Sequence, residues 1–252
     1  MSSPWAEEQR PTREPIFKLP GVILWLLAIM VGVQLILTYF AVNGDDETVK
    51  LVDVVFGFVP ARYNQAHPRT LFELASLVWP FITHGFVHGN WVHLFFNGVW
   101  LMAVGSPLAR RLGTPTFLAF YFVCGALAAA THLALNINSA SAGFPVVGAS
   151  GAISGCMSAA IRVMLSGSAR YFLGKSPGIG TLAPIWDRRI IVITVVFIGI
   201  NALSGTPFLQ LPGTGGAAIA WQAHVGGFLA GLIVIPFFDR LGGGSTRAYP
   251  TL

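Results

Sequence analysis

The sequence predicts an all-α membrane protein in which six helices cross the bilayer, and two observations support this. Hydrophobic residues make up 54% of the 252-residue chain and charged residues only 10%, whereas soluble domains have about 25% charged residues. The few charges also leave four long uncharged stretches, Leu19–Gly44, Leu74–Ala109, Leu112–Ile161 and Ile190–Phe238. This composition excludes an ordinary soluble globule, a disordered chain and a disulfide scaffold.

The four uncharged stretches divide into six crossings, because a helix needs about 20 apolar residues to span the hydrocarbon. The first stretch holds one crossing over about 20–42, and the second holds one over about 90–108. The third holds two, separated by the small polar segment Asn136–Val147. The fourth also holds two, separated by Gly205–Ala218, which is rich in Gly, Pro and Thr. The fifth crossing, about 190–204, is the shortest.

The distribution of basic residues gives the orientation of these crossings. Twelve of the 15 Lys and Arg residues fall on the side that holds both termini, and three on the other side. The twelve are Arg10, Arg13, Lys18, Arg110, Arg111, Arg162, Arg170, Lys175, Arg188, Arg189, Arg240 and Arg247, and the three are Lys50, Arg62 and Arg69. Basic residues concentrate on the cytoplasmic side of membrane proteins. Both termini are therefore expected to be cytoplasmic, and the net charge of +5 requires no nucleic-acid partner.

These crossings define the expected domain organisation. We expect a short cytoplasmic segment over 1–18, a six-span membrane domain over 19–239 and a short cytoplasmic tail over 240–252. The first span is longer than the 7–15 apolar residues of a signal peptide, so we expect it to be retained as an anchor. Cys124 and Cys156 fall within spans, where they are expected to be small buried residues.

Polar side chains inside the spans are the candidates for function, because they are costly in lipid. Asp and Glu are absent from the middle of every span. His93 and Asn97 lie in the first two turns of the second span, Ser150 begins the fourth, and His224 lies near the start of the sixth. These three spans enter from the same outer side, so the side chains should meet at one depth. His93 and Asn97 are four residues apart and share a helical face.

Small residues recur at intervals of four in the fourth and sixth spans, which lets two helix backbones approach closely. They are Gly151, Gly155 and Ala159 in one, and Ala223, Gly227 and Gly231 in the other. Ser150 and His224 each lie beside the start of a stripe, so facing stripes would bring them together. A hydroxyl beside an imidazole forms an activated nucleophile, because the ring accepts the Ser proton and returns it to the leaving amine.

The residues alone leave other interpretations open. A Ser beside a Gly and a lone His in a span are common packing residues. His84, His88 and His93 could instead bind zinc, although the His-Glu-x-x-His pattern is absent. The soluble hydrolase pattern Gly-x-Ser-x-Gly is not matched, because Ala152 takes the final Gly position. A small-solute transporter would show inverted repeats, which the sequence lacks.

Three segments resemble a known family. Gly148-Ala149-Ser150-Gly151 resembles the Gly-x-Ser-Gly motif of rhomboid intramembrane serine proteases. The segment from His84 to Asn97 is similar to the His- and Asn-bearing second helix of that family, and the segment from Ala223 to Gly231 is similar to its last core helix. The resemblance covers about 75–235 in the right order and implies a six-transmembrane-helix, rhomboid-like bundle.

The resemblance also implies a role for each motif residue. Ser150 would be the nucleophile and His224 its general base, a dyad without a third acid. The oxyanion would be held by the backbone N–H of Ser150 and by the side chains of His93 and Asn97; such donors are worth roughly 2.7–4 kcal/mol each. The remaining motif residues would be structural or line the mouth of the site: His88, Gly148, Gly151 and Gly227.

The family cleaves single-pass membrane proteins within the lipid bilayer without a cofactor or metal, which is what the resemblance implies here. The second and fifth spans would flank the substrate entry, Gly205–Ala218 would cover the site, and the compact chain is typical of a bacterial inner-membrane member. The sequence departs from the family at Ser154, where an aromatic often follows the nucleophile, and at Trp79-Pro80, where a Trp-Arg pair is common. The alternative is a catalytically silent relative that binds transmembrane helices.

Overall fold

The computed structural model describes residues 19–64, 67–68, 70–168, 182–206 and 219–242. The regular elements in these residues are helices. In addition, Phe58 and Val146 form one isolated antiparallel β-bridge. The expected terminal segments therefore fall wholly (1–18) or mostly (240–252) outside the described residues. The same is true of most of the expected cap, Gly205–Ala218, and of several basic residues that indicated the orientation.

Four helices are long and apolar enough to cross a membrane. They are α1 (Gly21–Val42), the continuous helix Trp91–Leu112, α7 (Thr114–Asn136) and α11 (Trp221–Leu241). The helix Trp91–Leu112 consists of α5 (Trp91–Trp100), a π-helical turn Leu101–Gly105 and α6 (Ser106–Leu112). The sequence therefore predicted these four crossings to within a few residues at each end.

The two other expected crossings correspond to shorter helices. α8 (Ser150–Val163) has 14 residues and continues into a π-helical turn, Met164–Ser168. α10 (Arg188–Ser204) has 17 residues, which gives a length of about 26 Å at ~1.5 Å per residue. Both lie among the longer helices, but neither is long and apolar enough by itself to be identified as a span. The count of six crossings therefore stays a prediction.

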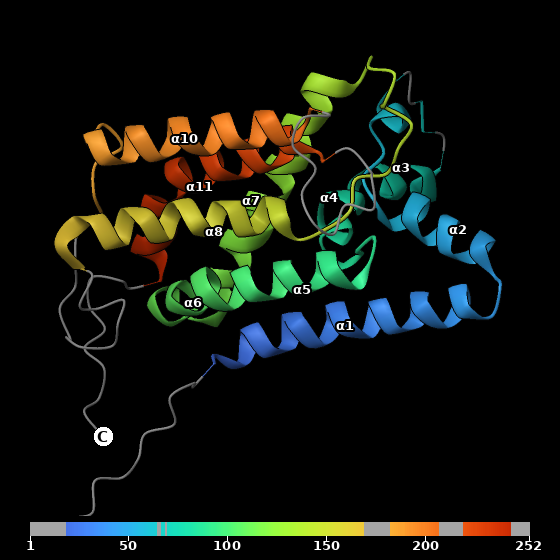
Figure 1. Ribbon diagram of the computed structural model, residues 1–252, viewed down its shortest axis with the longest axis horizontal. Coiled ribbons are helices and arrows are strands. Elements are labelled where there is room, and N and C mark those ends of the chain that lie inside the picture. Colours follow the sequence, from blue (N-terminus) through green and yellow to red (C-terminus); the bar gives the residue numbers. More distant parts are fainter. Residues whose placement is uncertain (1–18, 65–66, 69, 169–181, 207–218, 243–252) are drawn as a thin grey trace, which may run out of the picture.

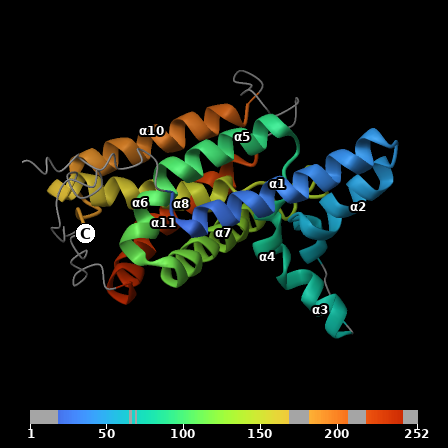
Figure 2. The ribbon, with the colours of Figure 1, turned by 90° about the horizontal axis from the view of Figure 1, so that it is seen from below.

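α8 lies in the middle of the bundle, between α5 on one side and α10 with α11 on the other (Figure 1). α11 packs against both α7 and α8, and α1 lies along the far side of α5 (Figures 1 and 2). The central position of α8 follows from its composition, because small residues let neighbouring helices approach it closely. Eleven of its 14 residues are buried. The residue that begins α8, Ser150, is half-buried, and the buried residues of the helix follow directly after it.

The chain between α1 and α5 folds into a series of short helices. They are α2 (Asp46–Phe56), a 3₁₀ turn Pro60–Tyr63, α3 (Leu71–Val78), α4 (Pro80–Thr83) and a second 3₁₀ turn, His84–Phe86. Asp45 caps α2 by accepting a hydrogen bond from the backbone N–H of Thr48. Hydrogen bonding with the side chain and then the backbone of Thr48 lowers the pKa of Asp45. α3 projects away from the helix bundle (Figure 2).

The Trp79-Pro80 departure has a structural explanation in this first loop. Pro80 occupies the first turn of α4, where its missing N–H costs no hydrogen bond. The Trp79 indole donates to the Val55 carbonyl at 2.8 Å, and the Thr83 hydroxyl donates to the Phe56 carbonyl at 2.7 Å. These bonds fasten α4 to the end of α2, so the loop is ordered without the Trp-Arg pair.

Polar contacts also hold the opposite end of the bundle together. Arg111 of α6 makes a two-point ion pair with Asp239 of α11, with N–O distances of 2.6 and 2.9 Å. Arg162 of α8 donates to the carbonyls of Ala183 and Leu232, at 2.9 and 2.5 Å. These contacts join the ends of α6, α8 and α11, far from Ser150 along α8.

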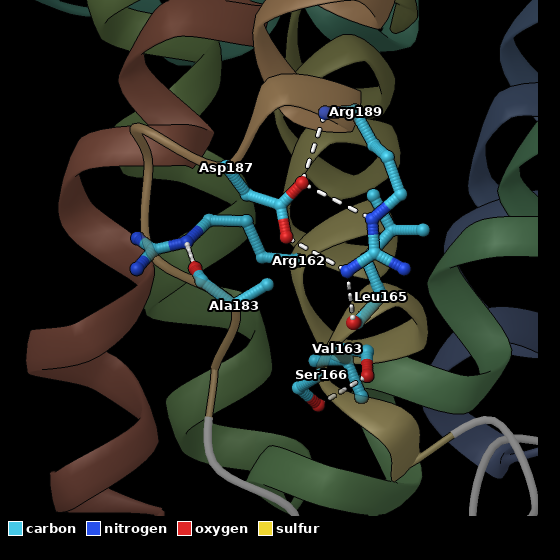
Figure 3. A network of polar contacts seen from close by, with 7 residues as sticks. All are labelled: Arg162, Val163, Leu165, Ser166, Ala183, Asp187 and Arg189. Carbon is cyan, nitrogen blue, oxygen red and sulfur yellow. Dashed lines mark hydrogen bonds and ion pairs between the residues drawn. The ribbon is translucent and has the colours of Figure 1, made fainter.

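Figure 3 shows how α10 starts beside this end of α8. Asp187 caps α10 by accepting from the backbone N–H of Arg189 at 2.9 Å, and its carboxylate pairs with the Arg189 guanidinium at 2.7 Å. This bonding lowers the pKa of Asp187 to about 2. Arg189 also donates to the Leu165 carbonyl at 3.0 Å, which connects the start of α10 to the end of α8.

Candidate active site

The segment before α8 positions the candidate nucleophile. The backbone N–H of Gly148 donates to the His84 carbonyl at 2.9 Å, and Gly148 has a φ of +113°, which side-chain-bearing residues rarely adopt. A Cβ at this position would also lie 2.6 Å from Cε1 of His93. Only glycine therefore fits here. Ser150 follows as the first residue of α8, where its backbone N–H lies outside the helix's own hydrogen-bond ladder.

Ser150 and His224 lie in direct contact. The Ser150 Oγ is 2.7 Å from Nε2 of His224, within the range of a hydrogen bond. His224 belongs to the first turn of α11, and Ser150 to the first turn of α8, so two helix starts meet at this point. The contact joins residues 74 positions apart in the chain. A hydroxyl that donates to an imidazole is the arrangement that can activate a serine as a nucleophile.

The stripes of small residues face each other, as the sequence predicted, and they set this distance. A Cβ added to Gly227 would overlap the Gly151 carbonyl oxygen, and one added to Gly231 would overlap the Gly155 carbonyl oxygen. The backbones of α8 and α11 are thus in contact with no side chain between them. Because this contact lies within one turn of Ser150 and His224, the main chains fix the spacing of the two side chains.

Asn201 is a third member of the site that the sequence analysis missed. Its Oδ1 lies 2.8 Å from Nδ1 of His224, on the side of the ring opposite Ser150. Asn201 belongs to α10, so a third helix reaches the candidate dyad. The available signal was the position of Asn201, a polar amide in a mostly apolar helix. No spacing rule in the sequence connected it to α11.

Ser154, at the position where relatives often have an aromatic residue, does not contact the His224 ring by a hydrogen bond. Its hydroxyl donates to the Ser150 carbonyl at 2.8 Å, one turn back along α8. The described hydrogen bonds to the His224 ring therefore come from Ser150 and Asn201. The ring is held at both nitrogen atoms.

His93 and Asn97 lie beside the same segment on the other face. The position that a Cβ of Gly148 would take is 2.7 Å from Nε2 of His93 and 3.4 Å from Nδ2 of Asn97. Both polar groups thus face the backbone two residues before Ser150. The Asn97 Nδ2 is buried and has no hydrogen-bond partner among the described residues. A buried amide donor without a partner is costly unless it serves a function.

Three other described histidines have ring or hydrogen-bond contacts outside the one between Ser150 and His224. His88 is buried and packs edge-on against His93, with ring centroids 5.1 Å apart. His84 is buried too, and its Nδ1 donates to the Pro80 carbonyl at 2.7 Å. His132 contacts Asn136 on α7 at 3.3 Å. Within the described part of the chain, no group of His, Cys, Asp or Glu is arranged to hold a metal ion, and His84, His88 and His93 form no such group.

A family model, described as the Rhomboid domain, matches residues 75–240, well over half of the chain. The chain belongs to the rhomboid family. The matched range agrees with the range of about 75–235 over which the motifs show the resemblance. With its long apolar helices, the chain is an integral membrane protein of this family.

Named relatives agree with this assignment at low sequence identity. Rhomboid-like protease 3 of Toxoplasma gondii is 22% identical over 205 residues, which cover 76% of this chain and 66% of the relative. Rhomboid protease GluP of Bacillus subtilis (strain 168) is 27% identical over 226 residues, which cover 89% of this chain and 36% of the relative. Rhomboid-like protease 1 of Toxoplasma gondii is 32% identical over 77 residues, 28% of this chain and 26% of the relative. The rhomboid chain thus matches 66% or less of each relative's length.

Proposed function

We propose that this rhomboid-family chain is an intramembrane serine endopeptidase with Ser150 as nucleophile and His224 as general base. The observation that carries the proposal is the 2.7 Å contact between Ser150 Oγ and His224 Nε2. This contact brings together a hydroxyl and an imidazole from two helices that the sequence motifs single out. The relatives named as rhomboid proteases support the same reaction class.

The proposed reaction is acyl transfer through a covalent intermediate. His224 Nε2 takes the hydroxyl proton while Ser150 Oγ attacks the carbonyl carbon of the scissile peptide bond. The C–N bond then breaks, and the same proton passes from the imidazolium to the leaving amine. An ester between Ser150 and the acyl part of the substrate remains. Water attacks this ester in the second half of the reaction, with His224 again acting as base and then as acid.

Three donors would stabilise the oxyanion formed on attack. They are the backbone N–H of Ser150, the side chain of His93 and the side-chain amide of Asn97. The backbone N–H lies at the start of α8, where the helix dipole is positive and favours an anion. The unpartnered Asn97 Nδ2 supports this role, because a developing oxyanion would give it an acceptor. Removing one such donor typically lowers kcat by about 10²–10³.

The proposed substrates are single-pass transmembrane proteins that reach the site from the lipid bilayer. α8 lies between α5 and α10 in the bundle (Figure 1), which supports entry of a substrate between these two helices. His93, Ser150 and His224 all lie in the first turn of their helices, which supports chemistry near one membrane surface. We further propose six crossings, cytoplasmic termini and a bacterial inner-membrane location, and a reaction that uses no cofactor, metal or nucleic acid.

The experiment is cleavage of a membrane-spanning reporter by the purified full chain in detergent or liposomes. Wild-type protein is compared with Ser150→Ala and His224→Ala, which should each abolish cleavage. Ser158→Ala is the matched control, because it removes a buried hydroxyl of the same helix that donates to the Gly155 carbonyl at 3.0 Å, away from His224. Labelling of Ser150 by a fluorophosphonate gives a second readout that needs no peptide substrate.

The outcomes separate the alternatives. Cleavage that persists in Ser150→Ala would refute the dyad. A well-folded wild-type protein that cleaves none of several reporters and resists the fluorophosphonate would instead be the catalytically silent relative that binds transmembrane helices.

A further inference from the structure

We propose that Asn201 is a positioning residue that holds the proton of neutral His224 on Nδ1 and so leaves the lone pair of Nε2 facing Ser150. The inference rests on the proposed function of this site and adds a member from a third helix. It assigns Asn201 no contact with substrate. Its role is to fix the orientation and the tautomer of the ring that acts as base.

The orientation of the Asn201 amide follows from its second hydrogen bond. The Nδ2 of Asn201 donates to the Phe197 carbonyl, one turn earlier in α10, at 2.9 Å. The other end of the amide, Oδ1, therefore faces Nδ1 of His224 at 2.8 Å. A carbonyl oxygen only accepts, so the ring must donate through an Nδ1–H.

The tautomer of a neutral imidazole then decides whether the dyad can work. When Nδ1 carries the proton, Nε2 has a free lone pair and can accept the Ser150 hydroxyl proton at the observed 2.7 Å. When Nε2 carries the proton, the ring donates toward Ser150 and cannot act as its base. Asn201 favours the first state, because only that state satisfies its Oδ1.

The helix pair α10 and α11 holds Asn201 in register with His224 through three contacts, one turn apart. Phe197 stacks on Phe228 with ring centroids 4.2 Å apart and planes 21° apart. Asn201 and His224 follow one turn nearer the end of α10. The next contact is between Gly205 and Trp221, where an added Cβ would overlap the indole ring. A contact on each side thus limits sliding of α10 along α11.

Ser154 increases the importance of this bond. Its hydroxyl bonds the Ser150 carbonyl and is too small to support the His224 ring by stacking. The ring is therefore restrained through its two nitrogen atoms, and Asn201 provides the bond on the side away from the reaction. Without it, the imidazole could rotate about its side-chain bonds and exchange tautomers.

The test reads the tautomer directly. The full-length protein is prepared in detergent micelles with ¹⁵N-labelled histidine rings, and the His224 signals are identified by their loss in His224→Gln. The wild type should show a neutral His224 protonated at Nδ1. Asn201→Leu, similar in size and without an acceptor, should lose this preference. Asn201→Asp, which keeps an oxygen acceptor, should retain it. Thr194→Val is the control, because it removes another side-chain oxygen from α10 two turns away.

The second readout is the rate at which a fluorophosphonate labels Ser150. Asn201→Leu should label about 100-fold more slowly than wild type, the low end of the ~10²–10⁴ that a positioned general base contributes. Asn201→Asp should recover a large part of the rate, and Thr194→Val should match wild type. A loss caused only by altered helix packing would leave the Nδ1 signal of His224 unchanged.

Each result decides between the two proposals. Retention of the Nδ1–H tautomer and of the wild-type labelling rate in Asn201→Leu would overturn the role of Asn201. If Asn201→Leu does not fold, loss of the Nδ1–H tautomer in a folded Asn201→Asp would overturn it instead. If wild-type Ser150 is never labelled, the proposed function fails, and the tautomer comparison still decides what Asn201 does.

Discussion

Gly227→Ala tests whether backbone contact between α8 and α11 sets the distance between Ser150 and His224. The added Cβ would overlap the Gly151 carbonyl oxygen and lie 2.8 Å from the carbonyl carbon. Ordinary contact begins at 3.4 Å, so the helices must separate by at least 0.6 Å, which is 3.4 minus 2.8. Backbone atoms cannot rotate away as a flexible side chain would. The two backbones would be forced apart at Gly227, which is three residues from His224 in the same helix. Almost the whole displacement would therefore be felt at the Ser150–His224 contact.

The expected cost has two parts. Overpacking of this kind destabilises a protein by about 1–3 kcal/mol. A shift of at least 0.6 Å would also lengthen the 2.7 Å contact to about 3.3 Å or more, beyond the ~2.5–3.0 Å typical of a hydroxyl donor. A misplacement of about 1 Å can lower a rate by about 100-fold. We therefore expect cleavage and Ser150 labelling to fall by about 10- to 100-fold in protein that still folds.

The matched control is Gly199→Ala in α10, where an added Cβ meets nothing within 4 Å. Thermal melting and the labelling rate of both variants are measured in the same detergent. Gly199→Ala should keep the wild-type rate. A wild-type rate in Gly227→Ala would refute the reasoning, because the helices would then be free to adjust without moving the dyad.

Three further predictions concern other parts of the chain. Asn97→Ala should lower kcat for reporter cleavage by about 10²–10³ with little change in KM, because the proposed donor would act on the oxyanion; an unchanged kcat would remove Asn97 from the proposed site. Burial raises the pKa of Tyr63 from 10.0 to about 12, so the stability that its neutral hydroxyl contributes is present below pH 10 and is lost as the pH rises through 12. Phenolate absorbance in an alkaline titration, compared with Tyr63→Phe, should show this late tyrosine, and a transition at pH 10 would contradict it. Arg111→Ala should destabilise the fold by about 3 kcal/mol, because it removes the two-point ion pair and leaves Asp239 with the more distant Arg162 charge. The melting temperature should partly recover in Arg111→Met/Asp239→Leu, and equal melting of all three proteins would contradict a stabilising role for the pair.

The sequence predicted the long helices well because lipid imposes a simple rule on them. A run without charges and of sufficient length has few alternatives to a helix, so α1, α7 and α11 begin and end within a few residues of the expected limits. α8 is different, since its Gly, Ala and Ser residues serve contact with other helices and lower its hydropathy. The short helices between α1 and α5 were not predicted, because they depend on hydrogen bonds to distant carbonyls.

In the candidate site, too, one part could be predicted from the sequence and another could not. Ser150 and His224 could be paired from the sequence because two stripes of small residues indicated which helices touch, and on which faces. Asn201 could not be paired, because α10 carries no such stripe and its rotation about its own axis is set by Phe197 and Phe228 stacking. A pattern within one helix reports the face that is buried, but only the packed structure shows which residue on another helix it meets.

The bridge between Phe58 and Val146 links the first loop to the segment that precedes Ser150. The backbone groups of these two residues exchange hydrogen bonds of 2.8 and 2.9 Å, and the Ala61 N–H donates to the Ala142 carbonyl at 2.9 Å. Backbone hydrogen bonds therefore hold the loop after α2 against the segment that leads into Ser150. A binder that holds this loop would act on the proposed nucleophile, Ser150, through these backbone hydrogen bonds, and would not need to occupy the proposed path of the substrate. Water-soluble antibody fragments directed at this loop are therefore a class of inhibitor to test against the proposed protease activity.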